Sequence, residues 1–511
     1  MRRDDFSVIL SINRNNRHKL TCYFRHKMKI IARENEKKLL QEIWESKSSE
    51  FLAVYGRRRV GKTYLIKNFY ENKGLFFHIT GTPFESTKQQ LWNFSQIFRE
   101  IFNNGEPHPV PKSWQEAFHQ LKDAIKIKKT TAKIILFFDE LPWLVTKKSG
   151  FVEALSYLWN RYLEADTRII LIVCGSAASW MISNIIDSRG GLYNRITRRI
   201  SLQPFNLWET ELYLKGKKVN LSRKQIVEIY MAIGGIAAYL DMVKPGKSSS
   251  QIISEICFNP QSPLYGEFDR LFKSLFSKSE IHTKIIRVLL NKRSGMDRSE
   301  LFTKAGVKSG SVQNRVKKEL IESGFIAETS HFGKRKKNAL FRLSDEYSAF
   351  YLKWHKEIKN SRLPVNPNHW MMLHSSTQFK TWAGYSFENV CLNHIHQIAK
   401  ALGFSGIIYS FSSWTYRPKN KNDKGVQIDL LIERSDNCIN LCEIKFSNRQ
   451  FTVTKDYSEK LLYKKEKFME VTNTRKTVFI TLITSFGAKE NAWYLEAVNN
   501  QLTLNDLFIP L

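Results

Sequence analysis

The chain has 511 residues, of which 42% are hydrophobic and 13% aromatic, so it is long enough for about three domains with buried cores. Lysine and arginine outnumber aspartate and glutamate by 80 to 48, a net charge of +32, which predicts a polyanionic partner, nucleic acid first and nucleotide second; a general lysine bias that favours solubility is the alternative. Apolar runs are shorter than a membrane span and the six cysteines lack metal-binding spacing, so we exclude a membrane protein and a zinc protein and expect a cytoplasmic one.

Residues 1–29 are basic and lack the apolar stretch of a secretory signal. We expect a disordered tail here, or a natural start at Met28. Residues 30–205 show alternating strand and helix patterns, which predict an α/β domain with a parallel sheet.

A strand–loop–helix pattern dominates this first domain. The apolar run 51–55 predicts a buried strand, and Gly56-x-x-x-x-Gly61-Lys62-Thr63 follows it and opens a helix. This is the spacing of a phosphate-binding loop in its expected context. Two glycines let backbone N–H groups wrap phosphates, and the helix N-terminus adds its positive end.

The loop residues divide into roles by their chemistry. Lys62 can reach the outer phosphates, and the hydroxyl of Thr63 can hold Mg²⁺. We therefore predict ATP and Mg²⁺ as cofactors. The predicted nucleotide contacts are Gly56, Arg57, Arg58, Arg59, Val60, Gly61, Lys62, Thr63 and Tyr64.

Two further apolar strands end in polar residues. The run 133–138 leads into Asp139 and Glu140, and the run 168–174 leads through Gly175 into Ser176. Strands of a parallel sheet deliver such residues to its carboxyl edge, where ligands bind. We predict that Asp139 binds Mg²⁺, that Glu140 orients or deprotonates the attacking water, and that Ser176 senses the terminal phosphate.

An arginine-rich segment follows at 188–200. Any of its four arginines can stabilise charge during phosphate transfer, from within the chain or from a neighbouring subunit, and a solvated basic turn is the alternative. These residues are Arg189, Arg195, Arg198 and Arg199, with Arg195 and Arg198 as the preferred candidates.

Together these motifs resemble the archaeal-type ATPase family, a branch of the AAA+/STAND P-loop proteins that also occurs in bacteria. The resemblance rests on Gly-Arg-Arg-Arg-Val-Gly-Lys-Thr, Phe-Phe-Asp-Glu, Cys-Gly-Ser and the segment 192–205. The segment 234–240 resembles the lid motif of that family, with Ala237 where proline is usual. The resemblance covers roughly residues 30 to 360 and implies a nucleotide-driven switch, with an α-helical lid at 206–272.

Residues 273–345 show three helix patterns with short gaps and then two strand patterns, at 325–329 and 339–343. This order is typical of a winged helix. Its third helix and the basic segment 333–337 suit contacts with a nucleic-acid groove and backbone. Packing against neighbouring domains without any nucleic acid is the alternative. An aromatic helix and a linker are predicted for 346–375.

The last region, 376–511, carries acids at regular positions in a second α/β pattern. Glu388 lies on a helix, Asp429 on a strand, and Glu443 and Lys445 share one face of the next strand. Carboxylates on adjacent strands can hold a hard cation, with a lysine beside the attacking water.

This order is similar to the PD-(D/E)xK restriction-endonuclease-like superfamily. The resemblance implies that Asp429 and Glu443 bind Mg²⁺, that Lys445 positions the nucleophile, and that Glu388 is an auxiliary acid. A catalytically silent domain is the alternative.

The sequence thus favours an ATP-hydrolysing switch that binds nucleic acid, DNA rather than RNA, and that is able to cut it. If one of the arginines at 188–200 acts on the site of a neighbouring subunit, the protein is a homo-oligomer. No membrane partner is expected. The competing hypothesis is a signalling or scaffold switch whose silent nuclease-like domain binds proteins.

Overall fold

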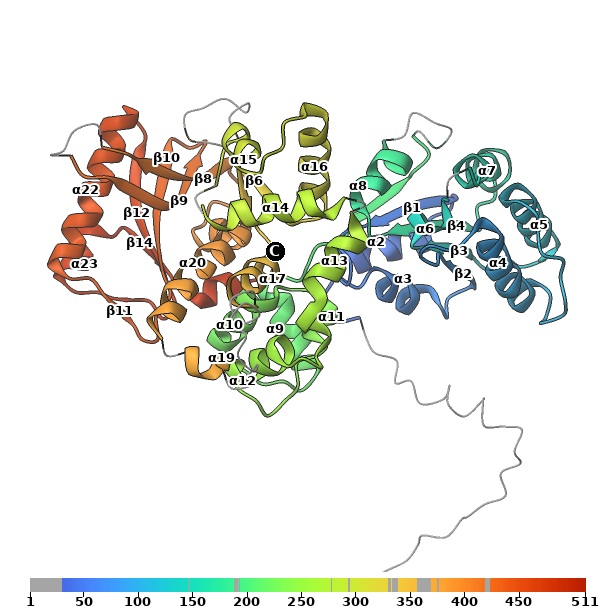
Figure 1. The fold of residues 1–511 in the computed structure, drawn as a ribbon, viewed down its shortest axis with the longest axis horizontal. Helices are drawn as coiled ribbons and strands as arrows, with labels where there is room; N and C mark the ends of the chain where they lie inside the picture. Colours follow the sequence, from blue (N-terminus) through green and yellow to red (C-terminus); the bar gives the residue numbers. More distant parts are fainter. Residues whose placement is uncertain are drawn as a thin grey trace, which may run out of the picture.

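The computed structural model describes residues 30–146, 148–187, 192, 194–276, 278–292, 295–329, 332, 339–355, 369–374, 376–418 and 423–511. The predicted tail, Arg189, the basic segment 333–337 and the linker at 364–367 lie outside these residues. The molecule is elongated, with one α/β region at each end and a helical middle (Figure 1). The chain ends in the middle, where Lys400 Nζ donates to the carbonyl of Pro510.

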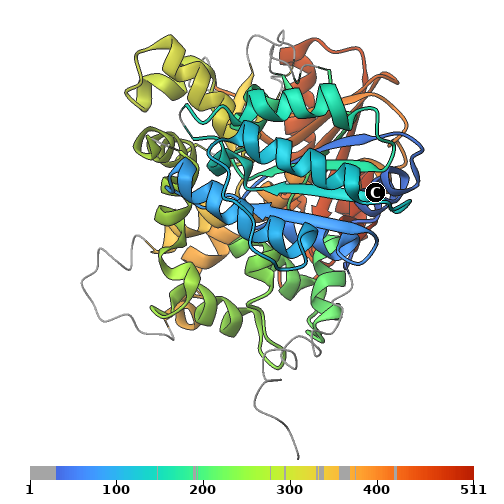
Figure 2. The same ribbon diagram turned by 90° about the vertical axis from the view of Figure 1, so that its right-hand side faces the viewer.

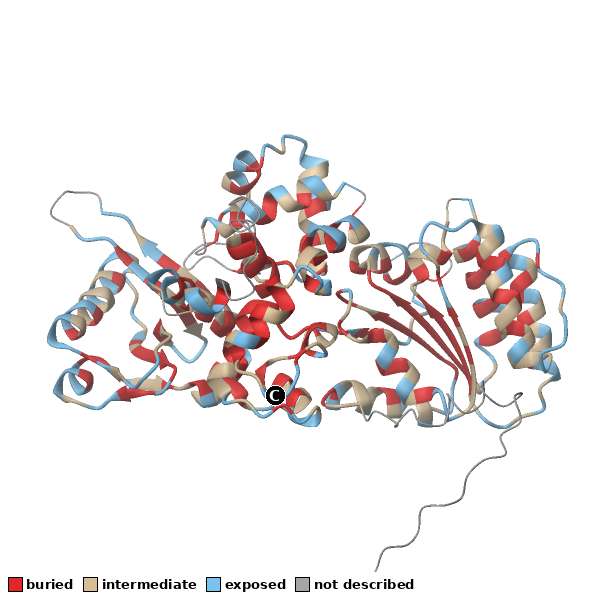
Figure 3. Cartoon of the chain, turned by 60° about the horizontal axis from the view of Figure 1, so that its bottom comes forward, coloured by how far each residue is buried: buried red, intermediate tan, exposed pale blue. Residues whose placement is uncertain are grey.

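The first α/β region is built on a five-stranded parallel sheet of order β2-β3-β4-β1-β5. The predicted apolar runs form its three central strands, which are buried almost throughout (Figure 3). Buried parallel strands need apolar residues on both faces, which explains why these runs do not alternate. The strands are β1 (Glu50–Tyr55), β2 (Leu75–Thr80), β3 (Ile134–Asp139), β4 (Ile169–Gly175) and β5 (Arg198–Ser201).

Helices cover both faces of this sheet (Figure 2). Successive residues of β1 supply different cores, Leu52 and Val54 on one face and Phe51 and Ala53 on the other, as the two-residue period of a strand requires. The helices are α2 (Glu34–Glu45), α3 (Lys62–Tyr70), α4 (Thr87–Phe102), α5 (Trp114–Ile127), α6 (Leu141–Leu144), α7 (Phe151–Leu158), η2 (Trp159–Leu163), α8 (Ala178–Met181) and η3 (Ile182–Ile186).

The predicted lid is a set of short helices in the middle of the molecule. Several begin with a capping box, in which the side chain at the helix start and the one three residues later satisfy each other's backbone N–H groups. The helices are α9 (Leu207–Gly216), α10 (Arg223–Ile233), α11 (Ala237–Leu240), α12 (Ser249–Ile253), η4 (Ser254–Phe258), η5 (Pro263–Gly266) and α13 (Glu267–Leu275).

Three helices and a two-stranded antiparallel ribbon follow, in the order that the sequence predicts. The helices are α14 (Ser279–Leu290), α15 (Arg298–Lys304) and α16 (Gly310–Glu322), and the strands are β6 (Ile326–Thr329) and β7 (Leu340–Leu343). The predicted aromatic helix begins as α17 (Glu346–Phe350) and continues as the π-helical turn η7 (Tyr351–His355). The short helix α19 (His369–Leu373) comes next.

The last region holds a mixed five-stranded sheet of order β14-β12-β10-β9-β8. Its strands are β8 (Tyr409–Tyr416), β9 (Val426–Arg434), β10 (Cys438–Lys445), β12 (Thr477–Thr484) and β14 (Asn500–Leu502), and a separate pair comprises β11 (Phe451–Thr452) and β13 (Ala488–Lys489). The helices are α20 (Thr377–Asn393), α21 (Ile395–Ala401), α22 (Lys455–Thr472), α23 (Ala492–Ala497) and η8 (Leu504–Phe508). Within the described parts of the chain, no helix has the length and apolar character needed to cross a bilayer.

An aromatic cluster joins this last region to the lid. Trp354 of η7, Trp370 of α19 and Trp382 of α20 are almost fully buried and lie 5.3 to 5.9 Å apart, measured between ring centroids. Phe258 of the lid stacks on Trp370 at 5.6 Å. Buried aromatic rings contribute large apolar areas, so the helical middle and the last region share one continuous core.

Candidate functional site

The phosphate-binding loop connects β1 to α3 and is shaped by its two glycines. Gly56 has φ +144°, and a Cβ atom there would lie 2.3 Å from the carbonyl oxygen of Leu202. Gly61 has φ +99° at the start of α3. Both conformations favour glycine, so the predicted loop is present as a backbone turn that opens directly into the helix.

Lys62 lies inside this loop and is only 5% exposed. Its ammonium group donates to the carbonyls of Gly56 at 3.0 Å and Arg57 at 2.9 Å, and to Ser176 Oγ at 3.0 Å. Ser176 Oγ in turn donates to Glu140 Oε1 at 2.7 Å. Three sequence-predicted residues, at the start of α3 and just after β4 and β3, therefore form one hydrogen-bonded chain, Lys62–Ser176–Glu140.

The predicted magnesium ligands meet beside this chain. Thr63 Oγ1 donates to Asp139 Oδ2 at 2.7 Å, and His78 Nε2 lies 3.8 Å from the same carboxylate. Burial alone would raise the pKa of the Asp139 carboxyl, but the nearby His78 and the hydrogen bond from Thr63 outweigh it and hold the pKa below its ordinary value. A hydroxyl and an ionised carboxylate are the oxygen donors that Mg²⁺ prefers, so these residues fit the ion.

The side chains of the three loop arginines lie in different surroundings, and their contact with nucleotide stays a prediction. Arg58 is exposed, whereas the side chains of the other two reach away from the loop. Arg57 forms a buried bidentate ion pair with Asp345, and Arg59 Nη2 lies 3.0 Å from Glu267 Oε2. Their side chains therefore bind protein carboxylates in this structure.

The remaining candidates around this site are more exposed. Tyr64 is 40% exposed. Arg195 pairs with Glu164 at 2.9 Å, with both side chains more than 40% exposed. Arg198 and Arg199 are exposed on the edge strand β5. Contact of these arginines with nucleotide stays a prediction.

Beside Asp345, the carboxyl of Glu346 is buried against β7 and α20. Burial and the neighbouring charge of Asp345 raise its pKa to about 7, and Asn393 Nδ2 donates to it at 2.6 Å. In the unfolded chain the same group titrates near its ordinary value of 4.5. Between these two values the folded state holds a proton that the unfolded state has lost, so stability falls as pH rises through that window.

The variant Glu346→Gln is expected to lack this loss. Relative to wild type, its free energy of unfolding should rise between pH 5 and pH 8, by up to about 3 kcal/mol. Urea denaturation at both pH values measures the change. Glu328→Gln, an exposed site, is the control. Parallel pH profiles for wild type and Glu346→Gln would contradict the assignment.

A second group of predicted residues meets in the last region, where β9 and β10 pair antiparallel. Asp429 Oδ2 accepts from the backbone N–H of Ile444 at 3.1 Å. Glu443 Oε1 accepts from Lys445 Nζ at 2.8 Å. Burial, followed by the charge of Glu443, raises the pKa of the Asp429 carboxyl, which is the expected effect of two carboxylates close together.

Two residues that the sequence analysis does not single out complete this group. Lys464 Nζ and Tyr457 Oη, both on α22, donate to Glu443 at 2.6 and 3.0 Å. Burial opposes ionisation of Glu443, but Lys445 and Lys464 prevail and lower its pKa. Glu388 on α20 is near enough to favour the charged form of Lys445. Within the described residues, no group of three or more His, Cys, Asp or Glu side chains is placed to hold a metal, so two carboxylates, Asp429 and Glu443, are the ligands available.

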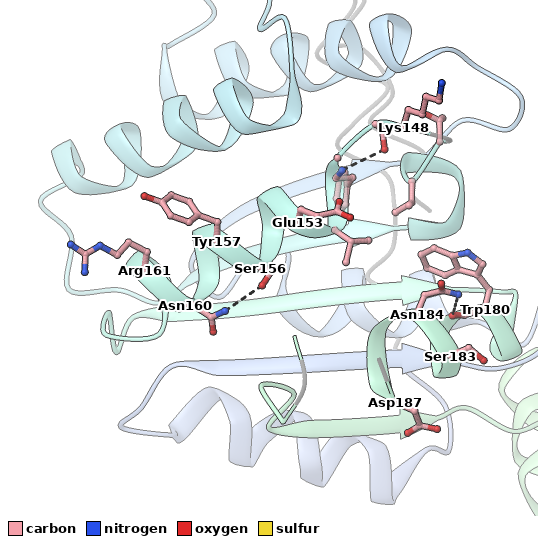
Figure 4. Close-up of a pocket in the computed structure, with 16 residues that line it drawn as sticks. Lys148, Glu153, Ser156, Tyr157, Asn160, Arg161, Trp180, Ser183, Asn184 and Asp187 are labelled. Carbon is pink, nitrogen blue, oxygen red and sulfur yellow. Dashed lines mark hydrogen bonds between the residues drawn. The ribbon is translucent and has the colours of Figure 1, made fainter. Parts of the chain in front are cut away.

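A hollow of about 1260 Å³ opens between α7 and α8 (Figure 4). Tyr157 and Trp180 contribute aromatic surface, Asn160 and Asn184 contribute amides, and Lys148 and Arg161 are balanced by Glu153 and Asp187. Ser183 on its rim accepts a hydrogen bond from Lys318 of α16 at 3.2 Å. The hollow therefore borders the helix that the sequence predicts to contact nucleic acid.

Comparison with known proteins agrees with the phosphate-loop geometry. The model of a family described as an ATPase domain predominantly from Archaea matches residues 30–243. An uncharacterized ATP-binding protein of Methanocaldococcus jannaschii is 46% identical over 43 residues, which cover 8% of this chain and 73% of the relative. Residues 30–243 are accordingly similar to an archaeal-type P-loop ATPase domain.

A longer relative is an uncharacterized protein of the same organism, 23% identical over 452 residues, which cover 87% of this chain and 94% of the relative. Among solved structures, the Walker-type ATPase of Pyrococcus abyssi is 18% identical with a TM-score of 0.44, and the match covers 63% of this chain and 96% of that one.

Proposed function

We propose that the chain is an ATP-hydrolysing switch whose nucleotide state controls nucleic-acid binding and Mg²⁺-dependent cleavage by its last region. The observation that carries the ATPase part is the hydrogen-bonded chain Lys62–Ser176–Glu140 beside the pair Thr63–Asp139. It brings together a phosphate-binding cation, a carboxylate able to orient water and two oxygen ligands at the carboxyl edge of one sheet.

Each residue of this site has a distinct task. The backbone N–H groups of the loop and the start of α3 hold the phosphates, and Lys62 exchanges its carbonyl partners for phosphate oxygens. Glu140 orients or deprotonates the attacking water, and Ser176 connects it to Lys62 so that both respond to the terminal phosphate. Bound Mg²⁺, held through Thr63 and Asp139, would neutralise the phosphate charge.

The nuclease part rests on the meeting of Asp429, Glu443 and Lys445 on two paired strands. The two carboxylates are candidate Mg²⁺ ligands, and Lys445 is placed on the same strand face as Glu443 to position a water. Bound Mg²⁺ would polarise the scissile phosphate.

Nucleic-acid binding is proposed for the helices α14–α16 and the ribbon β6–β7, read as a winged helix. The exposed side chains of α16 include Ser311, Asn314 and Arg315, which suit contacts with bases and phosphates. Two other polar side chains of α16 are engaged internally, since Gln313 Nε2 donates to the carbonyl of Val307 at 2.7 Å and Lys317 lies over the ring of Phe341.

The double variant Asn314→Ala/Arg315→Ala tests this surface. We expect it to bind duplex DNA about three- to tenfold more weakly than wild type and to lose part of any DNA stimulation of ATP hydrolysis. Fluorescence anisotropy at several salt concentrations, with RNA of the same sequence as a second arm, gives the affinities. The control is Lys126→Ala on the exposed face of α5. Equal binding by all three proteins would refute the proposed surface, and wild type without salt-sensitive binding would refute a nucleic-acid partner.

A second candidate function is a signalling or scaffold switch with a silent nuclease-like region. It is favoured by the hydrogen bonds of Glu443, whose two carboxylate oxygens already accept from Lys445, Tyr457 and Lys464. A carboxylate satisfied by protein cations needs no metal to be stable when buried. Under this alternative, ATP turnover would be independent of DNA and no cleavage would occur.

A further inference from the structure

The phosphate-binding loop is tied to the C-terminal half of the chain by a buried ion pair. The guanidinium of Arg57 meets the carboxylate of Asp345 in two hydrogen bonds, 288 positions away in sequence, and the two side chains are 4% and 1% exposed. The ring of Phe325 covers the guanidinium at 4.7 Å. A buried bidentate pair fixes orientation as well as separation.

Both ends of this pair are anchored to functional backbone. Asp345 is the N-cap of α17 and accepts from the backbone N–H of Ser348 at 2.9 Å and from its hydroxyl. At the other end, the carbonyl of Arg57 accepts from Lys62 Nζ at 2.9 Å. Arg57 therefore links the two sites: its side chain pairs with Asp345, and its carbonyl holds the phosphate-binding Lys62.

A second ion pair, between Arg59 and Glu267, connects the loop to α13. Arg59, which has φ +71°, pairs with Glu267 at the start of α13. Its carbonyl accepts from the backbone N–H of Ala238 at 3.2 Å, and Tyr239 Oη donates to Glu267 at 3.3 Å. The carboxylate of Glu267 is 2% exposed, so it too is held away from solvent.

We propose that Asp345 and Glu267 are positioning residues of the ATPase site, which set the shape of the loop through Arg57 and Arg59 and couple nucleotide binding to the C-terminal half. The inference rests on the proposed ATP-hydrolysing function. The loop binds phosphates with its backbone, so its conformation decides affinity. Coupling is reciprocal: if α17 and α13 affect nucleotide affinity, bound nucleotide affects their placement to the same extent.

The loop and the ion pair border a cavity that reaches the C-terminal half. Gly56, Arg57 and Asp345 line a cavity of about 770 Å³ that also borders Arg33 of the first region and Asn393 of α20. The loop, the Arg57–Asp345 pair and α20 therefore border the same cavity. This gives the nucleotide site a direct path to the helices that carry the last region.

The test compares Asp345→Asn, Asp345→Glu and Glu267→Gln with wild type, using the full chain. Equilibrium titration with a fluorescent non-hydrolysable ATP analogue gives nucleotide affinity, and steady-state phosphate release gives KM and kcat. We expect Asp345→Asn to weaken binding and raise KM about tenfold, with a smaller change in kcat. Asp345→Glu should recover part of the lost nucleotide affinity. Glu267→Gln should weaken nucleotide binding and raise KM about threefold.

The control is Asn389→Ala, which removes the acceptor of a half-buried hydrogen bond between β7 and α20, from Arg342 Nη1 to Asn389 Oδ1 at 2.6 Å. It should lower the melting temperature without changing nucleotide affinity. Unchanged affinity and KM in both Asp345→Asn and Glu267→Gln would overturn the positioning role. Failure of wild type to bind the analogue would instead refute the ATPase function itself. The Arg59 side chain is 30% exposed, so loss of its pair with Glu267 should disturb folding less than loss of the buried Arg57–Asp345 pair. Glu267→Gln therefore keeps the test decisive if Asp345→Asn does not fold.

Discussion

Substitution of Lys62 by alanine is expected to abolish ATP hydrolysis, with phosphate release at least about 100-fold below wild type. Lys62 is 5% exposed, and its ammonium group is held inside the loop by two carbonyls and Ser176. No other residue of the loop places a buried cation there, since Arg57 and Arg59 are paired with Asp345 and Glu267 and Arg58 is exposed. A phosphate-release assay under saturating ATP and Mg²⁺ measures the effect.

Lys67→Ala provides the matched control, because it removes a lysine from the same helix α3 outside the loop. It should leave turnover within about twofold of wild type, since surface substitutions away from a site have small effects. A Lys62→Ala protein that still hydrolyses ATP near the wild-type rate would mean that the phosphates bind elsewhere.

Substitution of Glu443 by glutamine is expected to remove Mg²⁺-dependent DNA cleavage, again by at least about 100-fold, while ATP hydrolysis continues. The change keeps the shape of the side chain but removes the negative charge that Lys445 and Lys464 stabilise. It also weakens the pair of carboxylates that is available for a metal. Cleavage of labelled linear and circular DNA, followed on gels beside phosphate release from the same samples, separates the two activities.

Glu459→Gln, at an exposed position of α22, is the control for this experiment. Cleavage by wild type and Glu459→Gln but not by Glu443→Gln would support the nuclease proposal. Cleavage that survives Glu443→Gln would assign it to another site or a contaminant. Absence of cleavage in wild type, with ATP hydrolysis intact, would favour the scaffold alternative.

Local patterns were sufficient to predict the parts of the site that lie next to each other on one sheet edge. The apolar runs end where strands end, and the residues that follow them, Asp139, Glu140 and Ser176, meet at Lys62 and Thr63 because parallel neighbours present the same edge. The α/β fold with its parallel sheet was predictable for the same reason.

Contacts between distant segments were not predictable in this way. Arg57 and Arg59 are predicted nucleotide contacts of the loop, and no local signal indicates that their side chains pair with Asp345 and Glu267, more than 200 positions later. Lys464 was missed because it lies on a helix rich in lysines, where one more cation suggests a solvated face. Its role depends on how α22 packs beside β10.

Some elements of the fold also escaped prediction for physical reasons. The edge strand β8 has a mixed burial pattern and a bulge between Ser412 and Trp414, so its alternation is broken. The three-residue strand β14 is too short to show a period. The aromatic segment after Asp345 changes from α- to π-helical at Tyr351, a change that a helical pattern does not reveal.

The junction between the lid and the last region has a consequence for how this protein can be divided. The backbone N–H of Leu207, at the start of α9, donates to His394 Nε2 at 3.0 Å, and burial keeps His394 neutral by lowering its pKa to about 4. A shortened gene that ended before α20 would leave this donor unsatisfied and would bare the tryptophan cluster. The lid and the last region therefore depend on each other for stability, because they share one core.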